Sequence, residues 1–344
     1  MIKFVENKRP DMARIATLLE DCAAENTWAN RGPVYYRMAD AFAEHLQIPS
    51  GSKLTPCTNG GVALEAMARL HEADAGRPLR WVSSSFTFQN MGRGYFADVT
   101  FVDCDAHGML DLATLRALDP DSYDGIVVVN TLGMAQDFSG YIEFARETGK
   151  AMLFDNAAGV RAGVPDWPWQ SFSLHQTKPY GQGEGGLAIT PADRADDFYT
   201  LLDYNAPPNE ARLWMNNGKI SDISCAFHLS RLEKVDDWSP LYHEQEVRIE
   251  GIAREMGLRP LMPVGGPTPK TSCAFLSESD VPLERLRMTR YVKFAKYYKP
   301  LAEKPVTSGI YASILNIPTH PDMAGVSKDQ IIGDLTTLIY GNED

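Results

Sequence analysis

The fold is decided by two apolar runs, GIVVV at residues 125–129 and AMLF at residues 151–154, with a helical pattern at residues 142–148 between them. Continuous apolar runs of this length leave no polar face for water. Such strands lie inside a parallel sheet that helices cover on both faces. The stretch therefore predicts a β-α-β unit of an α/β fold.

The same alternation continues on both sides of this unit. Further strands are predicted at residues 81–83, 100–102 and 187–190, and further helices at residues 64–70 and 90–96. Two helices precede them, at residues 11–24 and 36–46, on either side of a break at NRGP, residues 30–33. We therefore expect a mostly parallel central sheet with helices on both faces.

The alternation stops at a loop-like stretch, DYNAPP at residues 203–208, and a different pattern follows. Helices are predicted at residues 221–238 and 241–256, divided at Pro240, and at residues 327–340, where Ser327 and Gln330 have capping-box spacing. Short apolar segments lie between them, around residues 272–275 and 310–317. The chain is thus expected to have three parts: an N-terminal helix and arm (1–30), a large α/β domain (31–208) and a smaller C-terminal α+β domain (209–344).

The composition is that of a folded protein of enzyme size. The 344 residues are 44% hydrophobic and 23% charged, and 33 Lys+Arg against 45 Asp+Glu give a net charge of −12. An acidic body disfavours nucleic acid and anionic membranes as partners. No run approaches the roughly 20 apolar residues of a membrane span, no export signal is visible, and the five scattered cysteines form no C-x-x-C pair. We expect a cytoplasmic protein without a disulfide framework or metal site.

Several polar residues stand where α/β folds bind ligands, just after strands or at helix starts. Gly60 and Gly61 follow Asn59 at a helix start, which suits a phosphate but is also typical of a tight capped turn. Asp155 ends a strand, where a carboxylate can pair with a protonated ring nitrogen, bind a metal or cap the next segment. Phe88 can stack on a flat ring or belong to the core.

Lys178 lies between an apolar-polar alternation and the glycine-rich turn of residues 181–186. A lysine before a turn is usually solvated, whereas a partly desolvated one has a lowered pKa and can form a Schiff base. The other motifs of the sequence favour the second interpretation, a partly desolvated lysine. A strand-end aspartate, a glycine phosphate turn and a lysine are the three parts of a pyridoxal phosphate (PLP) site.

With these motifs the sequence resembles the sugar aminotransferases of the DegT/DnrJ/EryC1/StrS family, a branch of the fold-type I PLP enzymes. The similarity runs from about residue 28 to residue 321. It rests on NRGP (30–33), TNGGVAL (58–64), SFTF (85–88), FVDCD (101–105), SLHQTK (173–178), GEGG (183–186), NGKISDI (217–223), YYKPL (297–301) and LNIP (315–318). Three positions depart from the family pattern: Ala158 replaces His or Gln, Lys219 replaces Arg, and Gly61 replaces Thr or Ser.

The resemblance implies a role for each candidate residue. Lys178 holds PLP as a Schiff base, Asp155 pairs with its ring nitrogen, and Phe88 lies over the ring. The other expected cofactor contacts are Asn59, Gly60, Gly61, Ser173 and Asn217, the last reaching the phosphate of a neighbouring subunit. This implies a homodimer with shared active sites. Candidate substrate contacts are His175, Glu184, Lys219 and Arg31, although His175 and Glu184 are equally suited to structural roles.

The implied activity is transfer of an amino group from L-glutamate to a keto sugar, most plausibly a nucleoside-diphosphate keto-deoxyhexose, in amino-sugar biosynthesis. Three alternatives stay open. A sugar dehydratase of the same family carries histidine in place of the lysine, and Lys178 argues against it. A non-catalytic PLP- or sugar-binding regulator would explain Ala158 and Gly61 as signs of lost catalysis. A nicotinamide-dependent enzyme lacks support, because no G-x-G-x-x-G follows an early strand.

Overall fold

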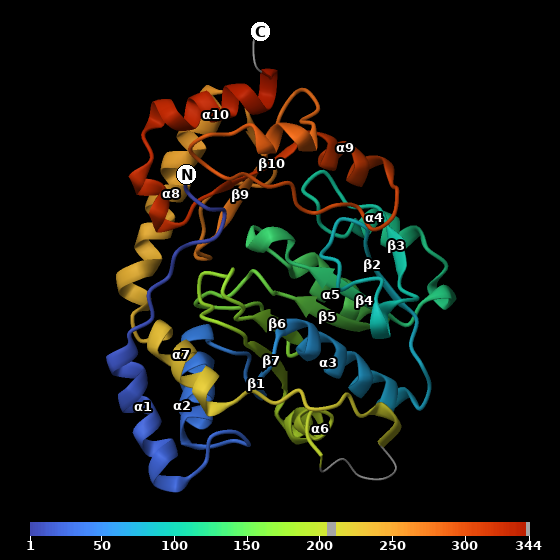
Figure 1. Cartoon of the computed structure of the whole chain (residues 1–344). Helices are drawn as coiled ribbons and strands as arrows, with labels where there is room; N and C mark the ends of the chain where they lie inside the picture. Colours follow the sequence, from blue (N-terminus) through green and yellow to red (C-terminus); the bar gives the residue numbers. More distant parts are fainter. Residues whose placement is uncertain (205–210, 342–344) are drawn as a thin grey trace.

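The computed structural model describes residues 1–204 and 211–341, and its central feature is a seven-stranded sheet (Figure 1). The strand order is β1-β7-β6-β5-β4-β2-β3. The strands span Ser52–Cys57 (β1), Trp81–Ser84 (β2), Thr100–Val102 (β3), Gly125–Val129 (β4), Ala151–Asp155 (β5), Gln170–Ser173 (β6) and Gly186–Pro191 (β7). Strands β3, β2, β4, β5 and β6 pair in parallel, and β7 runs antiparallel to both of its neighbours. The expected mostly parallel sheet is confirmed.

The continuous apolar runs that predicted the sheet are explained by its two covered faces. Along β4, Ile126 and Val128 pack on one face, with α4 (Leu112–Ala117) and α5 (Ser139–Thr148). Val127 packs on the other, with α3 (Gly60–Ala75) and α6 (Ala195–Thr200). Successive side chains of a strand alternate between faces, so every position of β4 is apolar and buried. Each such side chain contributes about 1.5–3 kcal/mol of burial free energy.

A helical layer covers the β1 edge of the sheet. It consists of α1 (Met12–Glu25), α2 (Pro33–Leu46) and α7 (Asp222–Leu232), whose apolar faces form one cluster that includes Leu18, Phe42 and Leu229. The helix predicted at residues 11–24 is confirmed as α1. The helix predicted from residue 36 begins three residues earlier, because Pro33 occupies the first helical turn, where proline needs no N–H partner.

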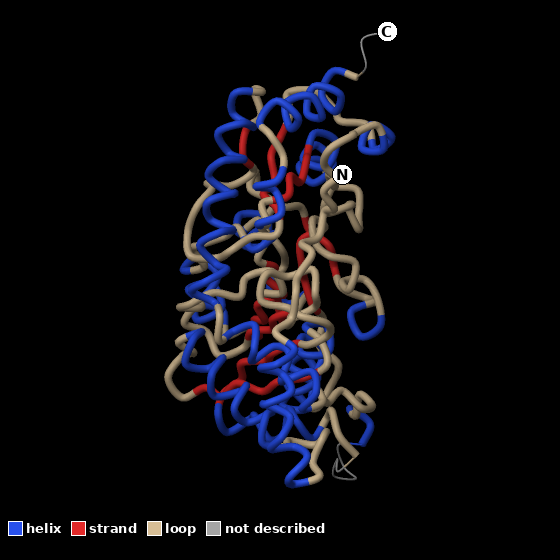
Figure 2. The backbone as a smooth tube through the Cα atoms, turned by 60° about the vertical axis from the view of Figure 1, so that its left-hand side comes forward, coloured by secondary structure: helices blue, strands red, loops and turns tan. Residues whose placement is uncertain are grey.

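The smaller part of the molecule is built on a three-stranded antiparallel sheet. Its order is β10-β9-β8, with β8 at Arg259–Pro260, β9 at Ser272–Leu276 and β10 at Ile314–Pro318. Helices α8 (Val235–Glu255), α9 (Pro305–Ser313) and α10 (Lys328–Tyr340) surround it. The N-terminal segment joins this part through a bridge between Ile2 and Val292. Figures 1 and 2 show the small sheet above the central one, with loops between them.

Three differences from the predicted elements have local causes. Residues 90–96 form a turn that contains only a short 3-10 helix, because Gly92 and Gly94 adopt left-handed φ values of 75° and 56°. Pro240 does not divide a helix but lies inside α8. Because proline has no N–H, the carbonyl of Asp236 lacks its intrahelical donor, and Asp236 is an exposed residue. The unforeseen strand β1 contains Pro56, which an edge strand tolerates.

The predicted domain boundary at residues 208/209 falls within residues 205–210, outside the described part of the chain. The capping box of Ser327 and Gln330 is confirmed at the start of α10. In the described ranges, no helix combines the length and the apolar character that crossing a membrane requires.

Candidate active site

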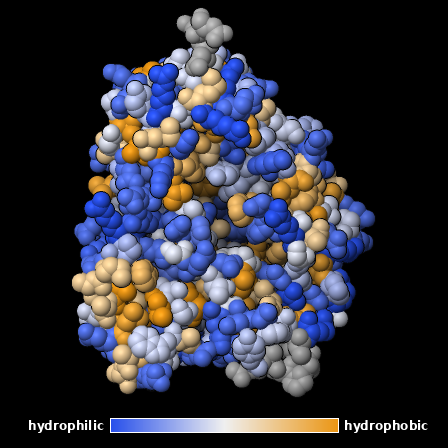
Figure 3. Space-filling view, viewed as in Figure 1, coloured by the Kyte–Doolittle hydropathy of each residue, from blue (hydrophilic) through white to orange (hydrophobic). Residues whose placement is uncertain are grey.

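A cavity of about 530 Å³ lies at the carboxyl ends of the parallel strands and also touches the smaller part of the molecule. Figure 3 shows this face of the molecule hollowed near its centre. Residues far apart in the sequence meet in the cavity, from Phe4 in the N-terminal arm to Tyr298. The cavity brings together most of the predicted site residues: Asn59, Gly60, Gly61, Phe88, Asp155, Ser173, His175, Lys178 and Glu184.

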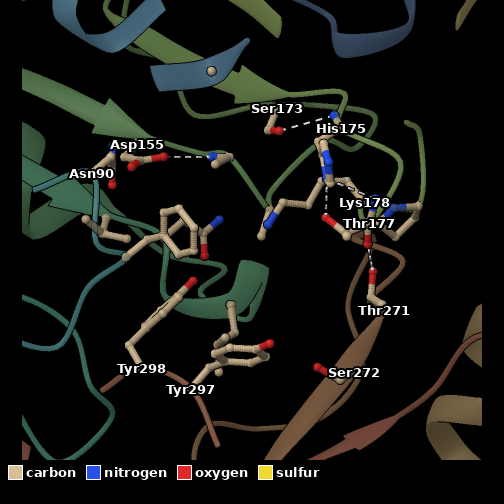
Figure 4. Close-up of a pocket in the computed structure, with 18 of the residues that line it drawn as sticks. Asn90, Asp155, Ser173, His175, Thr177, Lys178, Thr271, Ser272, Tyr297 and Tyr298 are labelled. Atoms are coloured by element: carbon tan, nitrogen blue, oxygen red, sulfur yellow. Dashed lines mark hydrogen bonds between the residues drawn. The ribbon is translucent and has the colours of Figure 1, made fainter. Parts of the chain in front are cut away.

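Lys178 enters the cavity from the loop that follows β6. A tight turn fixes its backbone, since its N–H donates to the His175 carbonyl (2.8 Å) and its carbonyl accepts from the Gly181 N–H (2.9 Å). The side chain extends into the cavity toward the side where Asp155 lies (Figure 4). Burial lowers the pKa of Lys178, and the Asp155 carboxylate partly opposes that shift. A lowered pKa leaves more of the amine unprotonated and nucleophilic near neutral pH.

Asp155 is the last residue of β5 and is only 5% exposed. Its Oδ1 accepts a hydrogen bond from the Ala157 N–H at 3.0 Å. Burial raises the pKa of Asp155, while the Ala157 N–H, Lys178 and the neighbouring Asn90 side chain pull it down. Few groups around Asp155 compensate its buried negative charge, so the carboxylate favours a cationic partner. A protonated ring nitrogen in the cavity would be such a partner.

The third part of the site is the N-terminus of α3. Asn59 caps this helix, and its Oδ1 accepts from the Val62 N–H at 2.9 Å. The N–H groups of Gly60 and Gly61 belong to the first turn, where no intrahelical acceptor exists. A Cβ on Gly60 would lie 2.9 Å from the Phe172 carbonyl oxygen, so glycine lets the helix start close to β6. The open N–H groups and the helix dipole form an anion site on the cavity wall.

His175 and Glu184 form a pair on the cavity wall. The Nδ1 atom of His175 accepts from the Thr177 N–H (3.3 Å), and its Nε2 atom lies 3.2 Å from Glu184 Oε1. The Ser173 hydroxyl oxygen accepts from the His175 N–H at 3.2 Å (Figure 4). Glu184 is largely exposed, so the pair is accessible to a ligand.

Aromatic side chains line the cavity together with Phe88. Phe88 is 51% exposed and contacts Tyr298 edge to face at 6.4 Å between centroids. Tyr297 contacts Phe4 of the N-terminal arm at 5.7 Å. In the sequence, residues 297–301 belong to the family resemblance without an implied role, and no local pattern marks Phe4 as a site residue. Asn90, next to Asp155, was also missed. The sequence predicts a helix at residues 90–96, where the structure has the turn that carries Asn90.

Three predicted residues lie outside this cavity. The Arg31 guanidinium stacks on the Tyr199 ring at 3.4 Å, and Lys219 Nζ donates to Asn30 Oδ1 at 2.5 Å. Asn217 is exposed on the segment before α7. The arrangement within one chain therefore gives none of them a contact with the cavity. Their predicted contacts with substrate or with a neighbouring subunit's cofactor stay predictions.

The donor set in the cavity fits PLP. A lysine amine suits its aldehyde, a buried carboxylate suits its ring nitrogen, a helix N-terminus suits its phosphate, and an exposed phenylalanine suits one ring face. In the part of the chain that the structure describes, no cluster of three or more side chains forms a candidate metal site.

Comparison with known proteins supports this assignment. The model of the DegT/DnrJ/EryC1/StrS aminotransferase family matches residues 11–251. Among curated relatives, the protein Rv3402c of Mycobacterium tuberculosis is 27% identical over 258 residues, 68% of this chain and 61% of that protein. L-glutamine:2-deoxy-scyllo-inosose aminotransferase of Streptomyces fradiae is 25% identical over 280 residues, 72% of this chain and 64% of that enzyme. The matches thus span less than two thirds of these relatives.

Solved structures share the fold over the full length. Helicobacter pylori PseC, an aminotransferase involved in the biosynthesis of pseudoaminic acid, superposes with a TM-score of 0.81 at 15% identity, covering 98% of both chains. A DegT DnrJ EryC1 StrS aminotransferase from Brucella abortus superposes with a TM-score of 0.79 at 20% identity, covering 96% of both chains. Because the family model covers more than half of the sequence, the chain belongs to the DegT/DnrJ/EryC1/StrS aminotransferase family, whose members are PLP-dependent.

Proposed function

We propose that the chain is a PLP-dependent aminotransferase that moves an amino group from L-glutamate to the keto group of a sugar, in amino-sugar biosynthesis. One observation carries the proposal: a desolvated lysine and a buried strand-end aspartate share one cavity with the open N-terminus of α3. The family match supports the same activity. A dehydratase of this family would need histidine in place of Lys178.

PLP supplies an electron sink that stabilises negative charge on the donor's Cα when its proton leaves. The residues of the cavity hold it as follows. The N–H groups of Gly60 and Gly61, with Asn59 and Ser173 beside them, bind the phosphate. Asp155 keeps a proton on the ring nitrogen, because separating the two charges would leave its buried carboxylate unpaired. Phe88 covers one ring face.

Lys178 Nζ has two functions in this proposal. It would hold the cofactor through the aldehyde carbon, and as an uncharged amine it would take the proton from the donor's Cα as a general base. Its lowered pKa favours both functions, since each requires the uncharged amine. The pair of His175 and Glu184 lies on the same wall and presents a proton donor and a carboxylate to the substrate's polar groups.

The proposed acceptor is a nucleoside-diphosphate keto-deoxyhexose. The aromatic side chains of Phe4 and Tyr297 offer apolar surface to the C–H groups of a sugar ring. The fold neighbour DesI was crystallised in the presence of its TDP-sugar product, which supports a nucleotide-linked sugar. The Streptomyces fradiae relative is named for L-glutamine and a cyclitol ketone. L-glutamine is therefore the second candidate donor, and a keto cyclitol the second candidate acceptor.

The proposed functional unit is a homodimer in which Asn217 of one subunit contacts the cofactor phosphate of the other. Two observations support it. Asn217 is exposed and outside its own chain's cavity. In addition, Met12 on α1, Tyr36 on α2 and Ile223 on α7 are large apolar side chains that remain exposed, as an interface between copies requires.

The test is to purify the full chain with PLP and to follow its visible absorbance. Wild type should be yellow, borohydride should fix PLP to Lys178, and L-glutamate or L-glutamine should bleach the colour as the amino form of the cofactor accumulates. Lys178→Ala is the control and should not be fixed. A wild-type protein that borohydride cannot fix would exclude the PLP assignment. A yellow protein that no amino donor bleaches would favour the non-catalytic binding protein.

A further inference from the structure

The loop that carries Lys178, residues 174–181, contains neither helix nor strand. Two backbone–backbone bonds within the loop close the turn around Lys178, from the Lys178 N–H to the His175 carbonyl and from the Gly181 N–H to the Lys178 carbonyl. Carbonyl groups of the loop also accept hydrogen bonds from side chains that lie outside it. The position of Lys178 therefore depends on the side chains that supply those partners.

Lys8 of the N-terminal arm supplies most of them. Its Nζ donates to the carbonyl of Gln176 at 2.9 Å, to the carbonyl of Gly181 at 2.6 Å and to the carbonyl of Lys178 itself. An ammonium group has three N–H donors, so all three of them are directed at this one loop. Bonds from a charged donor are stronger than neutral ones. The lysine proposed to bind PLP is thus held at its own backbone by a second lysine.

Two further side chains complete the set. The Thr177 carbonyl accepts from the Thr271 hydroxyl at 2.7 Å, and the Pro179 carbonyl accepts from Arg231 Nε at 3.1 Å (Figure 4). Thr271 directly precedes β9, and Arg231 lies on α7. The loop is therefore clamped from three elements that are distant in sequence, and Lys8 makes the largest number of bonds among them.

The arm holds Lys8 firmly enough for this purpose. Glu6 accepts from Arg231 at 3.3 Å and from the Tyr242 hydroxyl, and the Asn7 N–H donates to Asp322 at 2.8 Å. Burial and the nearby Arg231 lower the pKa of Lys8 to about 7, against the opposing charge of Glu6. These contacts therefore hold Lys8 in a fixed position beside the loop, whereas a solvated surface lysine is free to move.

We propose that Lys8 is a positioning residue for Lys178, its ammonium clamping the loop so that the Lys178 amine stays inside the cavity with Asp155. The effect of this positioning on catalysis rests on the proposed function. The placement of the Lys178 amine itself can be measured in protein without PLP, so the two ideas can fail separately.

The experiment compares Lys8→Met with Lys150→Met in the full chain without PLP. Lys150 is a matched control, because its Nζ also donates to main-chain carbonyls, those of Pro120 (2.6 Å) and Tyr123 (2.8 Å), and it precedes β5 at the sheet edge opposite the cavity. The pH dependence of Lys178 acetylation by acetic anhydride, read by peptide mass spectrometry, gives its apparent pKa. Lys8→Met should raise that value by about one unit toward an ordinary lysine. Lys150→Met should leave it unchanged, and Lys8→Arg should restore most of it.

A second readout is the rate at which PLP becomes fixed to Lys178 under borohydride. It should fall about tenfold in Lys8→Met, since a displaced nucleophile reacts slowly, and stay at the wild-type value in Lys150→Met. If Lys8→Met lowers Tm yet keeps the wild-type pKa and fixation rate at Lys178, Lys8 is only structural and the proposal is overturned. If Lys8→Met does not fold, Lys8→Gln, which keeps a neutral donor, is held to the same two criteria. A wild type that PLP does not modify refutes the proposed function, whereas the acetylation result still decides the role of Lys8.

Discussion

Asp155 shows at the scale of one residue how a binding site costs stability. Its carboxylate is 5% exposed, and burial is the largest influence on its pKa, which is raised. Keeping a charge there without a cationic ligand destabilises the folded protein. The residue is therefore better explained by a ligand that it binds than by a contribution to the fold.

Replacing this carboxylate should separate function from stability. Asp155→Asn keeps an oxygen for the Ala157 N–H but loses the charge. We expect the variant to lose amino transfer by about a hundredfold or more, because the ring nitrogen is no longer kept protonated. We expect its PLP-free form to have a higher Tm than wild type at pH 7.5. Calorimetry and the donor-bleaching assay measure the two effects, and a lower Tm in the variant would contradict the stated cost of the charge.

The pH dependence of that stability difference has a definite sign. A carboxyl group whose pKa is raised in the folded state binds more protons when folded than when unfolded, so its contribution to stability falls as pH rises above 3.8 through the folded pKa. The Tm advantage of Asp155→Asn over wild type should therefore grow from acid pH toward neutrality and disappear near the unfolded pKa. Calorimetry of both PLP-free proteins from pH 3.5 to 7.5 tests this. An advantage that shrinks with rising pH would contradict the assignment.

Lys178, Asp155 and the glycines of α3 could be identified from sequence because each follows a local pattern, a strand end or a helix start. Phe4 and Lys8 could not, since they reach the same cavity or loop from the N-terminal arm through long-range contacts. Local patterns report which backbone positions face a site. They carry no information on which distant segment closes it.

At the scale of elements, the turn that carries Glu184 is fixed by α7. The fully buried His228 accepts from the Gln182 N–H at Nδ1 (3.3 Å) and donates from Nε2 to the Glu184 carbonyl (3.0 Å). Burial lowers the pKa of His228 to about 4, so the ring is neutral and both bonds persist at neutral pH. Gly185 permits this contact, because a Cβ there would lie 2.4 Å from His228 Nε2. Gly185 thus serves packing against α7.

This contact can be tested with a double-mutant cycle. His228→Ala should cost about 1–3 kcal/mol, because it leaves buried polar groups of the turn unpaired. Gly185→Ala should be destabilising as well, through the clash with the ring. The double variant should cost less than the sum of the two, since the space left by the imidazole accepts the new methyl group. Urea unfolding of the four proteins gives the free energies, and strict additivity would mean that the two residues do not touch.

The secondary-structure predictions are correct where a strand is completely buried. They are wrong at glycines and prolines, because these residues occur in more than one kind of structure. β4 and β5 were located to within a residue, because their apolar runs face two packed helical layers. The break at Pro240 was wrong because proline early in a helix deprives only a solvent-accessible carbonyl of its partner. Strands β1 and β6 escaped prediction, since their sequences, SKLTPC and QSFS, interrupt the apolar run with proline or polar residues.

At the scale of the whole molecule, the net charge of −12 would repel the proposed anionic ligands, so positive groups within the cavity have to attract them. Among the described residues, the positive features of the cavity are the N-terminus of α3, Lys178 and Lys270, of which Lys270 is paired with Glu246 at 2.7 Å. Arg31 and Lys219, expected to contribute, are engaged elsewhere with Tyr199 and Asn30. In the proposed dimer, Asn217 of the neighbouring subunit would add a neutral amide donor to the phosphate site.

Co-assembly of two inactive variants tests this arrangement. Lys178→Ala and Asn217→Ala chains are each expected to be inactive or severely impaired alone. Mixed by unfolding and refolding together at equal amounts, they should recover about one quarter of the wild-type activity, because half of the dimers are mixed and each mixed dimer has one site with both residues. Cross-linking or light scattering confirms that mixed dimers form. Mixed dimers without recovered activity would mean that Asn217 acts within its own chain or outside the site, and the local positive field would then have to come from the chain's own helix terminus.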